Sequence, residues 1–265
     1  MELQSRYADI TRQGLGLIAI SYDAPATLKK FSDSRGIMFP LISDAGSAII
    51  KQYGLLNATV DPKSRTYGIP HPGTFIVDHR GVVRSRFFED AYQERYTAAT
   101  ILSTLGAGVA GSPITANTTH LTMTASISDA VAAPGERLAI VMNVTPKPGM
   151  HLYAPGKHDY QVVGLTIDPQ PWLRPQATIY PASQIYHFKP LNERIEVFMK
   201  PFQLRRDATL LATPESQKLL AGMTSVTITG ALEYQACDDK LCFNPARVPV
   251  SFVVKLKGLD LRPPG

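Results

Sequence analysis

The chain has 265 residues, of which 44% are hydrophobic and 18% charged, and this balance excludes a wholly disordered chain. Two cysteines, Cys237 and Cys242, are too few for a disulfide-rich scaffold. The net charge of +5 is spread evenly along the chain rather than gathered on one arm, so we expect no nucleic-acid partner. No apolar stretch approaches the roughly 20 residues that cross a bilayer, so we expect no membrane span.

The first 105 residues alternate between patterns typical of helices and of buried strands. Apolar positions at helical spacing predict a helix over residues 2–13, and the continuous apolar run at 15–21 predicts a strand buried on both faces. A short apolar run follows at 39–42, and we expect further helices at 24–35, 44–53 and 92–105 and strands at 74–77 and 82–88. This order predicts an α/β layer structure for residues 1–105.

Residues 106–117 are small, uncharged and rich in Gly, Pro, Ser and Thr. Such a composition is typical of a flexible linker, so we expect a domain boundary here. Beyond it the hydrophobic period falls to two, and turn residues separate most of the apolar runs. Strands are expected at 121–127, 137–144, 161–167, 178–180, 194–199, 208–212, 225–234 and 247–256, with one helical turn at 215–221. Many short strands predict an all-β antiparallel sandwich over residues 118–260.

The two cysteines flank a short turn between two predicted strands. Asp238, Asp239 and Lys240 are typical of a hairpin loop, which brings the flanking residues within disulfide distance. A structural zinc site needs four ligands, and no further His or Cys flanks the pair, so we expect no metal. From spacing alone, a structural bridge and a redox-active pair remain equally open.

Residues 120–257 resemble the N-terminal periplasmic domain of the disulfide reductase DsbD, an immunoglobulin-like sandwich. The resemblance is carried by YQACDDKLCFNPARVPVSF at 234–252 and GMHLYAPG at 149–156. It implies that Cys237 and Cys242 cycle between dithiol and disulfide, with Tyr153 close to the first cysteine. It also implies a cap loop with a shielding aromatic residue, for which Tyr186 and Phe188 are the candidates.

Residues 2–104 resemble the redoxin, or peroxiredoxin-like (AhpC/TSA-type), branch of the thioredoxin fold. The stretches that carry the resemblance are ELQSRYADI, LIAISYDAPATLKKFSDSRGIMFPLISDAGSAIIKQYGLLN and GIPHPGTFIVDHRGVVRSRFFED. In this family the position of Pro72 often holds a cis-proline before a sheet strand. The resemblance therefore implies a supporting role for Pro72 beside a bound thiol partner, whereas an ordinary trans turn proline is the alternative.

The N-terminal segment departs from this family in one respect. Family members place a central strand and a cysteine-bearing turn before the first helix, but here no cysteine precedes Cys237. Residues 1–104 are therefore expected to lack cysteine-based peroxide reduction, since no thiolate is available. Either the natural protein continues upstream of Met1, which we favour, or the domain is degenerate and serves for binding or support. The residues after Met1 also lack the pattern of an export signal, which an upstream stretch would carry.

Together these patterns predict a thiol–disulfide oxidoreductase. Its Cys237/Cys242 pair would exchange electrons with a thioredoxin-like or DsbD-type partner, without a cofactor, in the periplasm or another extracytoplasmic compartment. Peroxidase-type activity would require an upstream cysteine. Replacing Cys242 with Ala is expected to trap a mixed disulfide through Cys237. The alternative is a non-catalytic extracytoplasmic binding module in which the two cysteines form a passive bridge.

Overall fold

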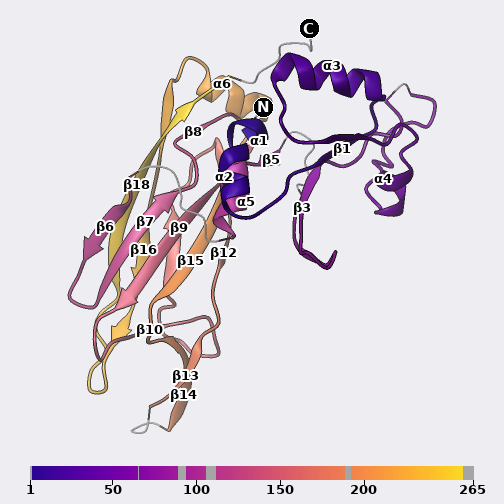
Figure 1. Cartoon of the computed structure of the whole chain (residues 1–265). Coiled ribbons are helices and arrows are strands. Elements are labelled where there is room, and N and C mark those ends of the chain that lie inside the picture. Colours follow the sequence, from indigo (N-terminus) through magenta and orange to yellow (C-terminus); the bar gives the residue numbers. More distant parts are fainter. Residues whose placement is uncertain (1, 65, 89–93, 106–111, 189–191, 259–265) are drawn as a thin grey trace. The chain divides into compact units, whose positions relative to one another are not determined.

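A computed structural model describes residues 2–64, 66–88, 94–105, 112–188 and 192–258 (Figure 1). The chain divides into two compact units, of which unit 1 comprises residues 1–107 with 259–265 and unit 2 comprises residues 108–258. Taken together, the described secondary structure is mostly β. No helix in these ranges is long and apolar enough to cross a membrane.

Unit 1 alternates short helices and strands, as its sequence pattern predicts. Its elements are α1 (Glu2–Ser5), α2 (Tyr7–Arg12), β1 (Ala19–Ser21), α3 (Pro25–Arg35), β2 (Leu41–Ser43), α4 (Ala48–Gln52), β3 (Gly73–Val77), β4 (Val83–Phe88), β5 (Arg95–Tyr96) and α5 (Ala98–Ser103). Strands β1 and β2 pair in parallel, and β3 and β4 form an antiparallel hairpin. The helix predicted at 92–105 is shorter than expected, since β5 precedes α5, and residues 89–93 lie outside the described residues.

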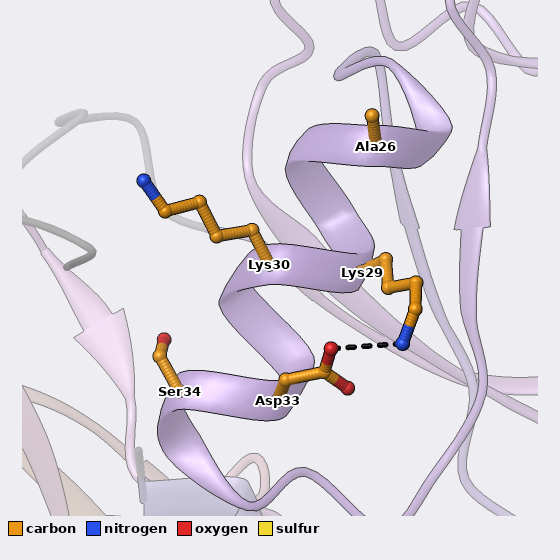
Figure 2. Close-up of a pocket in the computed structure, with 5 residues that line it drawn as sticks. All are labelled: Ala26, Lys29, Lys30, Asp33 and Ser34. Atoms are coloured by element: carbon orange, nitrogen blue, oxygen red, sulfur yellow. Dashed lines mark hydrogen bonds and ion pairs between the residues drawn. The ribbon is translucent and has the colours of Figure 1, made fainter.

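Helix α3 begins and ends at residues suited to those positions. Pro25 occupies the first turn, where its missing N–H costs nothing. Gly36 closes the helix in the left-handed conformation, with φ of 59°, which glycine adopts without a steric penalty. On the exposed face, Lys29 and Asp33 form an ion pair at 2.8 Å, one helical turn apart (Figure 2). Because both side chains are solvated, this pair adds little to stability.

Unit 2 is built almost entirely from strands. Its elements are β6 (Ile114–Asn117), β7 (Leu121–Ile127), β8 (Val131–Ala132), β9 (Glu136–Pro146), β10 (His151–Tyr153), β11 (Gly164–Ile167), β12 (Leu173–Ile179), β13 (Gln184–Phe188), β14 (Glu193–Phe198), β15 (Phe202–Leu210), α6 (Pro214–Leu220), β16 (Ser225–Tyr234), β17 (Ala236–Cys237) and β18 (Ala246–Leu256). Within this unit one sheet has the order β12-β15-β9-β7-β6, and a second has the order β11-β16-β18-β8. A third, smaller sheet has the order β13-β14-β10-β17 and holds the first cysteine.

The two larger sheets of unit 2 contribute to one hydrophobic core. Along β7 the residues alternate between buried and half-buried, so that Leu121, Met123 and Ala125 all enter the core. Strand β18 alternates between buried and exposed residues, and its buried residues pack into the same cluster. A slip of one residue would move these side chains to the opposite face, so burial fixes the register of both strands. This layered β-structure agrees with the predicted all-β class, while the immunoglobulin-like assignment stays a prediction.

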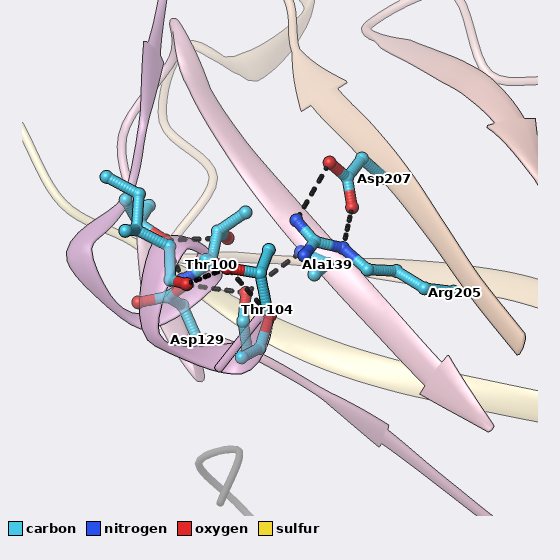
Figure 3. Close-up of polar contacts among 10 residues, drawn as sticks. Thr100, Thr104, Asp129, Ala139, Arg205 and Asp207 are labelled. Atoms are coloured by element: carbon cyan, nitrogen blue, oxygen red, sulfur yellow. Dashed lines mark hydrogen bonds and ion pairs between the residues drawn. The ribbon is translucent and has the colours of Figure 1, made fainter. Parts of the chain in front are cut away.

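Strand β15 carries a charged pair within this apolar framework. Arg205 donates from Nε to Asp207 Oδ1 at 2.7 Å and from Nη2 to Oδ2 at 3.1 Å, as Figure 3 shows. Residues two apart on a strand face the same side, which permits this bidentate geometry. Each charge thereby gains a partner on its own strand.

The structure corrects several details of the sequence prediction. Residues 114–117, expected to end the linker, form β6 and pair with β7, while residues 106–111 lie outside the described residues. The strand expected at 178–180 is the end of the longer β12, and that expected at 208–212 is the end of β15. Short strands β10, β13 and β17 went unpredicted. No peptide bond among the described residues is cis, so the bond before Pro72 is trans.

Candidate functional site

The turn between the two cysteines is shaped by its first aspartate. The carboxylate of Asp238 accepts hydrogen bonds from the backbone N–H groups of Lys240 and Leu241, each at 2.7 Å. An aspartate side chain that bonds the backbone two and three residues ahead stabilises a tight turn. The pKa of the Asp238 carboxyl is lowered chiefly by the Lys240 N–H and then by the Leu241 N–H. The turn therefore holds Cys237 and Cys242 together, and the two form a disulfide.

The two sulfur-bearing residues differ in solvent exposure. Cys237 is 1% exposed and lies in β17, whereas Cys242 belongs to the exposed part of the turn. Solvent therefore reaches the Cys242 residue more readily than the Cys237 residue. Cys237, through which the sequence analysis expects a mixed disulfide, is thus the less exposed of the two cysteines.

Tyr153 lies against the disulfide. Its hydroxyl oxygen is 2.8 Å from Cys237 Sγ and 3.2 Å from Cys242 Sγ. Because a disulfide sulfur carries no proton, the phenol is the donor in both contacts. Burial, followed by the nearby Tyr160 and Glu193, raises the pKa of the Tyr153 phenol well above its ordinary value. The phenol therefore stays protonated at neutral pH and presents a permanent hydrogen-bond donor to the sulfur atoms.

The aromatic ring of Tyr160 packs against Tyr153 and holds it in place. The Tyr160 ring stacks on the Tyr153 ring with centroids 4.2 Å apart and planes 3° from parallel. The Tyr160 hydroxyl donates to Glu193 Oε2 at 3.1 Å, which fixes the ring from the far end. Ile195 and Val197 pack with Tyr153 and Cys237 in a small hydrophobic cluster. These contacts limit the freedom of the phenol at the disulfide.

Strand β13 covers the site from the other side. The Tyr186 hydroxyl donates to Asp239 Oδ1 at 2.9 Å, which joins this strand to the turn of the disulfide. Phe188 lies beside Tyr186, with ring centroids 6.5 Å apart. Both side chains line a cavity of about 40 Å³ whose walls also include the disulfide, Tyr153 and Tyr160. The structure thus gathers Tyr153, Tyr186 and Phe188 around the cysteines, although their roles stay a prediction.

His151 lines the same cavity, and the sequence reasoning did not single it out. It is 4% exposed and stands directly opposite Cys237 in the pairing of β10 with β17. Its ring lies 4.6 Å from the Tyr186 ring. Burial lowers the pKa of His151, against the opposing effect of the charges of Asp239 and Asp238. The sequence signal was available, since residues two apart on a strand share a face and the HLY motif places His151 beside Tyr153.

Pro72, the remaining predicted site residue, belongs to unit 1 and directly precedes β3. Unit 1 contains no cysteine, so both sulfur atoms of the chain lie in unit 2. Within the described ranges, no three His, Cys, Asp or Glu side chains lie together in a group that would hold a metal ion. The candidate functional site therefore consists of the disulfide and the side chains around it.

Comparison with known proteins gives a family match for part of unit 1. Residues 1–86 match the AhpC/TSA family. The alkyl hydroperoxide reductase E of Mycobacterium tuberculosis is 31% identical over 85 residues, which cover 31% of this chain and 51% of that protein. The chain spans about half the length of the mycobacterial relatives it matches. The redoxin-like resemblance of the N-terminal segment is thereby confirmed.

Two solved structures are similar to the chain at low sequence identity. The N-terminal periplasmic domain of ScsB from Proteus mirabilis has a TM-score of 0.36 and 14% identity, covering 54% of this chain and 49% of that chain. The N-terminal domain of Neisseria meningitidis DsbD in the reduced form has a TM-score of 0.30 and 16% identity, covering 49% of this chain and 82% of that chain. These scores are too low to carry an argument about function. The AhpC/TSA match and the disulfide-bonded pair, by contrast, both support a redox-related function.

Proposed function

We propose that unit 2 exchanges a disulfide for two thiols through Cys237 and Cys242, with a thioredoxin-like or DsbD-type protein as its partner. One observation carries the proposal: Cys242, an exposed residue, is disulfide-bonded to the buried Cys237 beside the Tyr153 hydroxyl, a fixed hydrogen-bond donor. Thiol–disulfide exchange needs one sulfur within reach of a partner and a second sulfur that leaves and later returns.

The exchange consists of two displacements. A partner thiolate attacks Cys242 Sγ, the bond between the two cysteines breaks, and its electron pair stays on Cys237 Sγ. The second partner thiolate then attacks the mixed disulfide and releases Cys242 as a thiolate, so the partner is oxidised and this pair is reduced. Tyr153 donates to the departing Cys237 sulfur and stabilises its negative charge. In the opposite direction the same steps oxidise this pair and reduce the partner.

The loop that the disulfide closes is too short for a major structural role. With six residues in the closed loop, counting both cysteines, the chain-entropy model gives about 2 kcal/mol of stabilisation, near the low end for disulfides. Unit 2 already buries a large apolar core from both main sheets. A domain with such a core does not depend on a bridge at one hairpin, which favours a redox role over a passive one.

We also propose an extracytoplasmic location, because disulfides persist in oxidising compartments. Unit 1 would then serve as the redoxin-like companion of unit 2. Its family match supports a role in the same redox chemistry, but peroxidase-type activity would require a cysteine that this sequence lacks in that unit. Supporting roles for Pro72 and for the aromatic cover of Tyr186 and Phe188 belong to the same proposal.

Two measurements test the exchange function. The first equilibrates the full chain in defined redox buffers and quantifies free thiols by alkylation. A reduction potential of about −120 to −270 mV supports exchange, whereas a value well below about −300 mV supports a structural bridge. The second is a trapping experiment with Cys237→Ala. This variant lacks the cysteine that would resolve a mixed disulfide between Cys242 and a partner. We expect this variant to accumulate a mixed disulfide with a thioredoxin-like protein, and Cys242→Ala to accumulate far less.

A further inference from the structure

His151 shares the cavity of the disulfide but has no part in the exchange described above. We infer that the His151 imidazole accepts the proton of the Cys237 thiol when Cys237 closes the disulfide. The inference rests on the proposed exchange function and assigns the residue that activates the buried cysteine. The observation that supports this inference is the position of His151 and Cys237 on neighbouring strands.

The strand pairing brings His151 and Cys237 to the same face of the small sheet. The two residues are directly opposite each other in the antiparallel pair of β10 and β17. Side chains at such positions leave the sheet on one side, with Cβ atoms about 4.5–5.5 Å apart. Tyr153 lies two residues further along β10 and faces the same side, and its ring meets the His151 ring edge-on at 5.7 Å. The imidazole, the phenol and the Cys237 sulfur thus line one cavity.

A proton acceptor is needed because Cys237 is buried. The thiolate, not the thiol, attacks a disulfide, and burial in apolar surroundings disfavours the charged form. Cys237 is 1% exposed, so water has little access to its sulfur. Transfer of the thiol proton to a neighbouring group within the cavity provides the thiolate without direct contact with bulk solvent.

The other titratable groups around His151 are Tyr153, Tyr160, Tyr186, Asp238, Asp239 and Lys240. The tyrosines and Asp238 are poorly suited to accept the thiol proton. Burial raises the pKa of each of the three tyrosines, so they remain protonated donors at neutral pH. The carboxylate of Asp238 is engaged by two backbone N–H groups, which lower its pKa and make it a weak base.

His151 has the properties that these neighbours lack. Burial is the dominant influence on its pKa and lowers it, while the negative charges of Asp239 and Asp238 oppose this effect. A histidine with a lowered pKa is mainly neutral at pH 7, so a ring nitrogen has a lone pair free for a proton. The adjacent carboxylates then favour the imidazolium that forms after proton transfer.

The resolving step can be written with all atoms accounted for. A partner is bonded to Cys242 Sγ in a mixed disulfide, and Cys237 is a thiol. The proton of Cys237 moves to a ring nitrogen of His151, and the resulting thiolate attacks Cys242 Sγ. The bond between Cys237 and Cys242 forms, the bond to the partner breaks, and the partner leaves as a thiolate. The imidazolium then returns its proton to solvent through the turn, or to the departing thiolate.

The test uses the full chain, reduced and freed of reductant, mixed with the aromatic disulfide 5,5′-dithiobis(2-nitrobenzoate). Attack by exposed Cys242 releases one coloured thiolate in a first phase, and attack by Cys237 on the mixed disulfide releases a second one. We expect His151→Gln to slow the second phase at least tenfold at pH 7 and to leave the first phase within about twofold. His187→Gln is the matched control, because His187 is exposed on β13 and points away from the cavity-lining positions.

The pH profile separates a proton-accepting role from a merely structural one. In the native chain the second-phase rate should rise with pH and then become constant. Because the pKa of His151 is lowered, this plateau should begin at a pH below about 6.5, the ordinary histidine pKa. In His151→Gln it should continue to rise toward the thiol range near about pH 8.5. An unchanged second phase with an unchanged profile would overturn the inference while leaving the exchange function intact. A native chain that releases no second thiolate would overturn both.

A second measurement keeps the inference testable if His151 variants do not fold. The imidazole proton resonances of the native chain are titrated by NMR in the dithiol and disulfide states. We expect the pKa of His151 to differ between the two states, since a thiol beside the ring couples to its charge and a disulfide does not. An identical titration in both states would contradict the proposed proton transfer.

Discussion

Tyr186 and Asp239 lie 53 positions apart in the sequence, yet the tyrosine hydroxyl donates to the aspartate carboxylate at 2.9 Å. The hydrogen bond joins β13 to the turn between the cysteines. Strand β13 forms the edge of the small sheet, and its aromatic side chains line the disulfide cavity. A single substitution at Tyr186 would remove this hydrogen bond and leave the strand pairing in place.

The first prediction concerns this hydrogen bond. Tyr186→Phe should accelerate reduction of the disulfide by dithiothreitol about two- to tenfold, because one exposed hydrogen bond contributes at most about 1.5 kcal/mol to holding the cover closed. The rate is measured by the appearance of free thiols. His187→Gln, on the exposed face of the same strand, should leave the rate unchanged. Equal rates for Tyr186→Phe and the native chain would show that β13 does not limit access.

The second prediction concerns the phenol at the sulfur atoms. Tyr153→Phe keeps the aromatic packing but removes the donor that lies 2.8 Å from Cys237 Sγ. In the Cys242→Ala background, this change should slow alkylation of Cys237 by iodoacetamide roughly tenfold at pH 7, because the thiolate loses a charge-assisted hydrogen bond. Tyr180→Phe, which changes a tyrosine outside the cavity lining, serves as the control. A similar rate in both variants would remove Tyr153 from the proposed mechanism.

The third prediction concerns acid pH and the turn. The folded-state pKa of Asp238 is lowered by backbone N–H groups, so its contribution to the turn is present above the ordinary aspartate value and is lost as pH falls through the lowered value. The amide resonances of Lys240 and Leu241 should therefore remain constant from pH 7 to about pH 4 and shift below it. Asp238→Ala should show the shifted amide resonances already at pH 7. Amide resonances that titrate well above about pH 4 would refute this assignment.

The fourth prediction concerns packing between β11 and β16. A Cβ atom at Gly230 would overlap the carbonyl oxygen of Thr166 and lie 3.1 Å from Cα of Ile167. Both atoms belong to backbone and cannot rotate away, so Gly230→Ala should lower the free energy of unfolding by about 1–3 kcal/mol. Urea denaturation measures this loss. Gly258→Ala, where no atom lies within 4 Å, should have almost no effect.

Local patterns in the sequence predicted much of the secondary structure. The alternation along β7 and β18 identified long strands, because a strand with one buried face repeats every two residues. The proline and glycine at the ends of α3 placed that helix within one residue at each end. The short strands β10, β13 and β17 were missed, since two to five residues carry too little periodicity to be recognised.

The sequence alone determined part of the composition of the site: two cysteines around a turn that Asp238 stabilises. Tyr153, 84 residues before Cys237, was inferred from the family resemblance. The turn could be predicted because its hydrogen bonds join residues two and three positions apart. Tertiary structure alone decided which cysteine is exposed, because burial of Cys237 depends on its pairing with β10, more than eighty residues earlier. The same pairing placed His151 opposite Cys237. Contacts between distant segments are set by strand register and shared burial, and no local pattern in the chain encodes them.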